Sequence, residues 1–277
     1  MGNTTKQRRH QDWLMGFVGM THRHFGKLIS SYGYRIMTKR LGDDEAHFLN
    51  WGYEEDPPMA IPLEPADEID RHSIQLYHRT AAQIDLEGKD VLEVSCGHGG
   101  AASYISRYLK TKSYTGLDLN PAGIEYCRQR HPLPGLKFVH GDAEKLPFPD
   151  GSFDAVVNVE AAHLYPHFPV FLAEVARVLR PGGHFLYADL RGHDQIAQWE
   201  ADMAASSLRE LSRADIITEV QRGLEKNSVR HTELIAKHAP KPLRKIFRDI
   251  SGVQGQKLHQ SVESGELVYR VFDFVKD

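Results

Sequence analysis

The sequence predicts one α/β domain built on a doubly wound, mostly parallel sheet. From about residue 72 onward, short apolar runs alternate with amphipathic helical patterns, which is the order of elements typical of such a sheet. The 277 residues are 41% hydrophobic and 26% charged, so the chain is long and apolar enough for one large core. No apolar run approaches the ~20 residues that a membrane-spanning helix needs.

Five short apolar runs are expected to form the parallel strands, with helices between them. The strands are Asp90–Val94, Ser113–Leu117, Leu136–His140, Phe153–Val159 and His184–Leu190. A helix around residues 72–84 precedes the first strand, and the later helices cover Gly99–Leu109, Pro121 to about Arg130, and Phe168–Leu179. Asn120 supplies the N-cap of the third helix and Pro121 its first residue, while Pro181-Gly182-Gly183 ends the fourth.

Two further parts are expected to frame this core. Residues 1–71 are predicted to be a helical, lid-like extension, and residues 72–277 the main domain. Residues 194–250 are predicted to be wholly helical, with Ser212 as an N-cap and a break at Asn227-Ser228, and to form a lid over one end of the sheet. Apolar residues alternate with polar ones over Glu266–Val275, which predicts a closing strand.

The net charge of −3 conceals a strong asymmetry near the N-terminus. Residues 1–40 carry eight Lys or Arg and one acid, whereas residues 41–70 carry ten acids and no Lys or Arg. Because aromatic and aliphatic residues interleave with the basic ones, residues 6–40 suit an interfacial helix that touches an anionic membrane or a lipid; the alternative is a solvated helix packed on the domain. Nucleic-acid binding is disfavoured, since the chain is slightly acidic and has no recognisable binding motif.

The cysteine content and the N-terminal sequence indicate where the protein works. Cys96 and Cys127 are the two cysteines, and neither a disulfide nor a zinc site is expected from them. The apolar stretch after the first basic residues is interrupted by Gly16, Gly19 and His22, so no secretory signal is expected. We therefore expect a cytoplasmic protein, with peripheral contact to the inner face of the membrane if residues 6–40 form the interfacial helix.

A glycine-rich turn follows the first predicted strand and opens a helix, a pattern that brings backbone close to a ligand. Gly97 and Gly99 lie in this turn, and Glu93 lies just before it, where it can reach the amino group of a donor directly or through water. Asp118 ends the second strand, at the position of a carboxylate that accepts ribose hydroxyls. After the third strand, Asp142 and the backbone of Ala143 can bind an adenine ring.

These acids distinguish between the cofactors that a glycine-rich turn could hold. A pyrophosphate needs a helix N-terminus directed at its charge, whereas a sulfonium group is positive and suits Glu93, Asp118 and Asp142. The sequence therefore predicts S-adenosylmethionine (SAM) as methyl donor, S-adenosylhomocysteine as product, and no metal. The remaining predicted cofactor contacts are Ser95, Cys96, Leu119, Asn158 and Glu160.

The same residues carry a family resemblance. The segments Glu93–Gly100, Asp118, Asp142-Ala143, Phe153–Val157 and Leu179–Gly183 resemble the motifs of Rossmann-like class I methyltransferases over about residues 88–190. Three further segments, Asn50–Met59, Leu76–Ala81 and Gly252–Gly255, resemble the mycobacterial phthiotriol/phenolphthiotriol dimycocerosate methyltransferase family from about residue 30 to the C-terminus. That family includes fatty-acid and glycopeptidolipid O-methyltransferases, so the resemblance implies a long lipid acceptor. The first 25 or so residues look like an addition to the family's shorter form.

A hydroxyl acceptor must lose a proton during methyl transfer, whereas a carboxylate is already ionised. His163 follows the fourth strand, and Asp189 ends the neighbouring fifth strand, so the two are predicted to pair with His163 as the base. Packing or water binding by His163 is the alternative, and Glu160 could instead orient substrate or cofactor. Trp51, Tyr53, Tyr77 and Tyr165 are candidates for the lid and for the methionine end of the donor, or for ordinary core packing.

The predicted function is transfer of a methyl group to an oxygen of a long-chain lipid, either a hydroxyl or a fatty-acid carboxylate. C-methylation of a sterol-like or polyprenyl acceptor is the second enzymatic hypothesis, because such enzymes share the cofactor motifs. A SAM-binding scaffold without activity is the third, and the acceptor-side residues argue against it.

Overall fold

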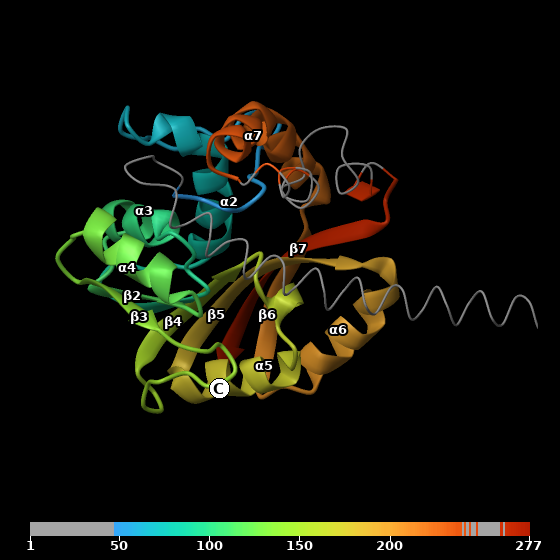
Figure 1. Cartoon of the computed structure of the whole chain (residues 1–277). Helices are drawn as coiled ribbons and strands as arrows, with labels where there is room; N and C mark the ends of the chain where they lie inside the picture. The colour runs from blue at the N-terminus through green and yellow to red at the C-terminus, as the bar shows by residue number, and fades with distance from the viewer. Residues whose placement is uncertain (1–46, 240, 242–243, 245–247, 249–260, 263) are drawn as a thin grey trace, which may run out of the picture.

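The computed structural model describes residues 47–239, 241, 244, 248, 261–262 and 264–277 (Figure 1). The predictions for the basic segment 6–40 and for Gly252–Gly255 therefore lie outside the described residues. No helix in these described ranges is long and apolar enough to cross a membrane.

A seven-stranded sheet forms the centre of the molecule, in the order β3-β2-β1-β4-β5-β7-β6. The first five strands are parallel, and β7 runs antiparallel to both β5 and β6. This confirms the predicted doubly wound, mostly parallel sheet. The strands are β1 (Asp90–Val94), β2 (Ser113–Asp118), β3 (Leu136–His140), β4 (Phe153–Val159), β5 (Leu179–Gly192), β6 (Leu208–Asp215) and β7 (Leu267–Lys276).

Helices cover both faces of the sheet (Figure 1). Alternate strand residues point to opposite faces, so Val91 and Val157 join one apolar cluster while Leu92 and Val156 join the other. The first cluster packs against α2 (Arg71–Ala81), α3 (Gly100–Tyr108), α4 (Pro121–Arg130) and α7 (Ile217–His238), and the second against α5 (Phe168–Val178) and α6 (Ile196–Ala204). Short 3-10 turns occur at η1 (Glu68–Asp70), η2 (Ala162–Leu164) and η3 (His193–Gln195).

The prediction that residues 194–250 are wholly helical is wrong in two places. Ser212 is not an N-cap but lies in β6, which forms the edge of the sheet beside β7. One face of this edge strand is solvated, so its apolar residues are too few to reveal a strand. Asn227-Ser228 does not break α7, because the buried Asn227 side chain donates from Nδ2 to the Trp51 carbonyl and to Ser73 Oγ, both at 3.2 Å.

A segment that we call the strap, residues 47–54, crosses the carboxyl ends of the parallel strands. Gly100 N donates to the His47 carbonyl at 3.2 Å, which ties the strap to the start of α3. Tyr53 N donates to the His72 carbonyl and Glu54 N to the Glu219 carbonyl, both at 2.9 Å. The strap is therefore held by α2, α3 and α7 together, and it closes the space above the sheet.

Candidate active site

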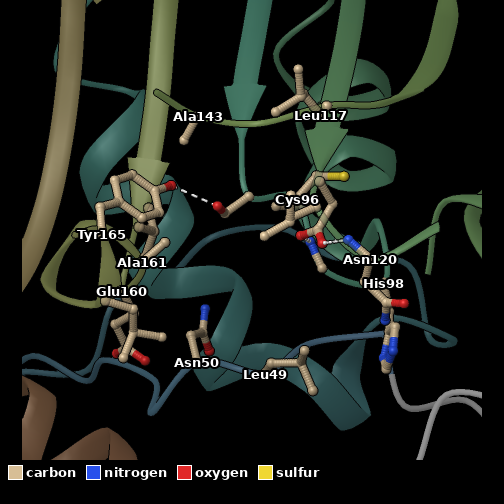
Figure 2. Close-up of a pocket in the computed structure, with 18 of the residues that line it drawn as sticks. Leu49, Asn50, Cys96, His98, Leu117, Asn120, Ala143, Glu160, Ala161 and Tyr165 are labelled. Carbon is tan, nitrogen blue, oxygen red and sulfur yellow. Dashed lines mark hydrogen bonds between the residues drawn. The ribbon is translucent and has the colours of Figure 1, made fainter. Parts of the chain in front are cut away.

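A cavity of about 330 Å³ lies between the carboxyl ends of β1, β2, β3 and β4 and the strap. Ligands of doubly wound sheets bind at this edge. Figure 2 shows Cys96, Asn120 and His98 at one end of the cavity, Glu160, Ala161 and Tyr165 at the other, and Asn50 and Leu49 of the strap between them.

The glycine-rich turn forms the wall after β1. Gly97 and Gly99 have φ values of +54° and +79°, and Gly99 is the N-cap of α3. A Cβ on Gly99 would lie 2.8 Å from the His131 ring and 3.1 Å from Cys127 Sγ, so this close approach excludes larger residues. Ser95 also has positive φ, and its Oγ lies 2.6 Å from the Tyr165 hydroxyl. The turn therefore presents backbone and one hydroxyl to the cavity.

Asp118 connects the end of β2 to this turn. Its Oδ2 accepts a hydrogen bond from Gly97 N at 2.9 Å, and its Oδ1 accepts one from Asn120 N at 2.8 Å. Burial raises the pKa of Asp118, and the backbone donors offset part of that rise. Each oxygen keeps a free lone pair, so the carboxylate can also accept the two hydroxyls of a ribose.

The predicted adenine contacts lie next to Asp118. Asp142, Ala143 and Leu119 line the cavity, and Asp142 Oδ1 accepts a hydrogen bond from Glu144 N at 2.9 Å, which fixes the turn after β3. Leu119 and Ala143 give this part of the wall apolar surface suited to an aromatic ring. Cys96 lines the cavity beneath the turn.

Three predicted cofactor residues do not line the cavity. Glu93 is almost fully buried in β1, where its Oε2 accepts from the Tyr114 hydroxyl at 3.0 Å, and burial raises its pKa to about 7. Asn158 donates from Nδ2 to the Val94 carbonyl at 2.9 Å and to the Tyr165 hydroxyl at 3.0 Å, so it supports the wall from behind. Gly99 likewise lies behind the lining, at the start of α3.

The predicted pairing of His163 with Asp189 is present. His163 Nδ1 lies 2.7 Å from Asp189 Oδ1, and His163 N donates to Asp189 Oδ2 at 2.8 Å. Burial by itself would raise the pKa of Asp189, but the charges of His163 and Arg191 and their hydrogen bonds outweigh it and hold the pKa well below its usual range. His163 is not among the residues that line the cavity, although its neighbours Ala161 and Leu164 are.

Glu160 does line the cavity, at the end of β4. Trp51 N donates to both of its carboxylate oxygens at 3.1 Å, and the Tyr269 hydroxyl donates to Oε1 at 3.0 Å. Burial raises the pKa of Glu160 to about 8, against the lowering effect of these donors, and the nearby Asp189 adds to the rise.

The aromatic candidates divide into two groups. Tyr77 and Tyr165 line the cavity, whereas Trp51 and Tyr53 are buried in the core and contribute through the backbone of the strap. Sequence reasoning missed the strap residues His47, Phe48, Leu49 and Asn50 as well as His98, Asn120 and Glu144. The segment that begins at Asn50 indicated the family but carried no sign that it crosses the glycine-rich turn.

The chain is similar in sequence and in fold to known proteins. A family described as "Methyltransferase domain" matches residues 92–187. The chain is 60% identical to the phthiotriol/phenolphthiotriol dimycocerosates methyltransferase of Mycobacterium tuberculosis over 95% of this chain and 97% of the relative. It is 54% identical to the fatty-acid O-methyltransferase of Mycolicibacterium smegmatis over 88% of each.

Two solved structures share the fold alone. The [4+2]-cyclase SpnF matches with a TM-score of 0.67 at 18% identity, over 88% of this chain and 94% of the cyclase. The geranyl diphosphate C-methyltransferase of Streptomyces coelicolor A3(2) matches with a TM-score of 0.59 at 16% identity, over 86% of this chain and 93% of that enzyme.

Proposed function

The chain belongs to the phthiotriol/phenolphthiotriol dimycocerosates methyltransferase family, and on that premise we propose that it transfers the methyl group of SAM to an oxygen of a long-chain lipid. One observation carries the proposal: a single cavity extends from the glycine-rich turn and Asp118 to the carboxyl group of Glu160. It offers a place for a donor at one end and for an oxygen acceptor at the other.

The residues of the cavity fit SAM. Asp118 would hold the ribose, Asp142 and Ala143 the adenine, and the backbone of Ser95–Gly97 the remainder of the donor. Carboxylates face the cavity, and no lysine or arginine is among its described lining residues, so the field favours a cationic ligand. When bound, SAM supplies an activated methyl group. The protein aligns the acceptor with that group and excludes water, which is the main requirement of a displacement reaction.

An apolar acceptor fits the rim of the cavity. Leu49 and Leu164 both line it, and these residues are 38% and 41% exposed. Exposed leucines in the lining of a cavity favour contact with an aliphatic chain. The names of the relatives support this, since one name includes phthiotriol/phenolphthiotriol dimycocerosates and another a fatty acid. We therefore propose a lipid hydroxyl or a fatty-acid carboxylate as the methylated group.

Which group takes the proton from a hydroxyl acceptor is a separate question. The role of His163 as the base remains a prediction. Asp189 holds its imidazole, but Glu160 lines the cavity and His163 is not among the lining residues. As the base, His163 would give a loss of ~10²-fold in turnover for His163→Ala with hydroxyl acceptors. It would give little change with carboxylate acceptors, which have no proton to lose.

Product analysis tests the proposed reaction. The purified full chain is incubated with a lipid extract and SAM labelled in the methyl group, and the labelled lipids are then treated with alkali. Label released by alkali indicates a methyl ester, and label retained on an oxygen by mass spectrometry indicates an ether. Label attached only to carbon would overturn O-methylation in favour of C-methylation. SAM binding without any labelled lipid would leave only a SAM-binding scaffold.

A further inference from the structure

We propose that Glu160 holds the acceptor oxygen and that its protonation state decides which class of acceptor the enzyme methylates. As a carboxylate, Glu160 takes the hydrogen of a lipid hydroxyl; as a neutral acid, it donates a hydrogen bond to a fatty-acid carboxylate. The inference rests on the proposed function, because it assigns a substrate class to each state of the same site.

The backbone at Glu160 is strained, and this strain places its carboxyl group at the cavity. Among the described residues, Ser95, Lys110 and Glu160 are the non-glycine residues with positive φ, and two of these three line the cavity. A glutamate at φ +50° is unfavourable unless surrounding contacts enforce it. Here the Glu160 amide donates to the Ala188 carbonyl at 2.9 Å and so continues the β4–β5 ladder. The side chain turns toward the strap, beside Asn50 (Figure 2).

Contacts from two separate elements fix the carboxyl group of Glu160. The strap contributes the Trp51 amide, and β7 contributes the Tyr269 hydroxyl. Both groups donate, so they satisfy a carboxylate, while its other lone pairs remain available to an acceptor. The residue is nevertheless partly accessible, and it is one of the residues that line the cavity.

Among the described residues, the titratable groups that interact with Glu160 include Asp189 on β5, Tyr269 on β7 and Tyr77 on α2. Asp189 is itself paired with His163 and Arg191, which compensate part of its negative charge. Burial and Asp189 disfavour ionisation, and the pKa of about 8 leaves both forms accessible around neutral pH. The positive charge of bound SAM would favour the carboxylate, whereas a second carboxylate in the cavity would favour the neutral acid. The acceptor and Glu160 therefore compete for one negative charge.

The chemistry balances for both acceptors. With a hydroxyl, the oxygen–carbon bond forms as the sulfur–carbon bond breaks, and the hydroxyl proton passes to the Glu160 carboxylate, which later releases it to water. With a carboxylate, neutral Glu160 donates to one oxygen while the other takes the methyl group, and no proton leaves. In this scheme His163 is a positioning residue that fixes the turn after β4 through Asp189.

Opposite pH profiles for two matched acceptors test the inference. A long-chain alcohol and a fatty acid of the same length are presented in the same uncharged detergent micelles to wild type and to Glu160→Gln. For wild type, kcat/KM should rise about tenfold with the alcohol and fall about tenfold with the acid over the two pH units centred on the pKa of Glu160, which is about 8 before SAM binds. Bound SAM shifts both transitions to lower pH by the same amount. In Glu160→Gln, kcat/KM should fall ~10²-fold or more with the alcohol and less than about fivefold with the acid, and neither pH profile should show the transition seen in wild type.

Three controls keep the result interpretable. Tyr269→Phe removes one donor to the carboxylate and should move both transitions to higher pH. His163→Ala should lower kcat/KM for both acceptors by a similar factor and leave the pH of both transitions unchanged. Calorimetric binding of S-adenosylhomocysteine, which lacks the sulfonium charge, by Glu160→Gln within about threefold of wild type shows that the variant is folded and keeps its donor site.

The outcomes separate the inference from the proposed function. Parallel pH profiles for the two acceptors, an equal loss of both in Glu160→Gln, or loss of the alcohol alone in His163→Ala would each overturn the role of Glu160. Methylation of only one class of acceptor at every pH would overturn the proposal that the protonation state of Glu160 decides the acceptor. If wild type labels neither oxygen acceptor, the proposed function itself fails.

Discussion

Replacing Asp118 with alanine tests the assignment of the donor site most directly. The carboxylate does two things: it accepts hydrogen bonds from Gly97 N at 2.9 Å and Asn120 N at 2.8 Å, and it faces the cavity where a ribose would bind. The variant therefore removes the support of the glycine-rich turn and the proposed contacts to the ribose together.

The size of the effect follows from the hydrogen bonds lost. A hydrogen bond to a charged group contributes about 1.5–3 kcal/mol, and water compensates part of the loss in an open cavity. We therefore expect SAM binding to weaken by about 1–3 kcal/mol, or roughly 5- to 150-fold. Because two partly buried amides lose their acceptor, the free energy of unfolding should also fall, by about 1–3 kcal/mol.

Isothermal calorimetry with S-adenosylhomocysteine, together with denaturant unfolding, measures both quantities. Asp118→Asn keeps one carbonyl oxygen for Gly97 or Asn120 and should be intermediate in both. Asp215→Ala is the matched control, because Asp215 Oδ1 accepts from Ile217 N at 3.2 Å and Asp215 is not among the residues that line the cavity; the variant should lose stability but not SAM affinity. If Asp118→Ala binds the ligand as tightly as Asp215→Ala does, the assignment of the ribose to Asp118 is wrong.

Three further variants probe the packing around the site. Asp189→Asn leaves the buried Arg191 uncompensated and should lower the free energy of unfolding by roughly 3–5 kcal/mol. Since the pKa of Asp189 is depressed, this loss of stability should be complete above about pH 4 and should shrink as the pH falls further. Urea titrations at several pH values measure it. A glycine-to-alanine change inside a helix normally stabilises it by about 1 kcal/mol. In Gly223→Ala, however, the new Cβ would clash with the backbone of Gly52 and Tyr53, so we expect a lower melting temperature and weaker SAM binding. Val229→Ala, at an exposed position of α7, is the control. Glu160→Gln removes a carboxyl group whose pKa is raised from 4.5 to about 8. The stability of the variant relative to wild type should therefore increase by up to about 1.4 kcal/mol per pH unit between pH 4.5 and 8, and level off above pH 8. A stability difference that does not change with pH would show that Glu160 titrates normally.

The parallel sheet was predictable because its information is local. β1 and β4 are largely apolar and buried along most of their length, whereas β2 and β3 are only partly buried. Glu93 lies within β1, Asp118 is the last residue of β2, and Asp142 follows the end of β3 by two positions. The His163–Asp189 pair followed from the rule that β4 and β5 are neighbours. By contrast, β6 is an edge strand whose only partner is β7, and its residues alternate too weakly to be distinguished from a polar helix.

The positions of the strap and of the Glu160 side chain were not predictable in this way, because they depend on tertiary contacts. Asn50 and Trp51 bind residues more than 20 and 100 positions away, at Ser73 and Glu160. No periodicity records such contacts. The sequence placed Glu160 correctly at a strand end, but its positive φ and its donors arise from the strap and β7.

This division has a consequence for specificity. Proteins with 16–18% identity share the sheet with this chain, and one of them is a cyclase, so the sheet does not determine the reaction. The proposed donor end of the cavity is made by the strand ends and the glycine-rich turn, which are the parts that the sequence motifs describe. The proposed acceptor end is made by the strap, Glu160 and Tyr269, which come together only through long-range contacts. Acceptor choice should therefore respond to a substitution on β7 that leaves SAM affinity unchanged, and Tyr269→Phe, which removes one donor to the Glu160 carboxyl group, is the smallest change that tests this separation.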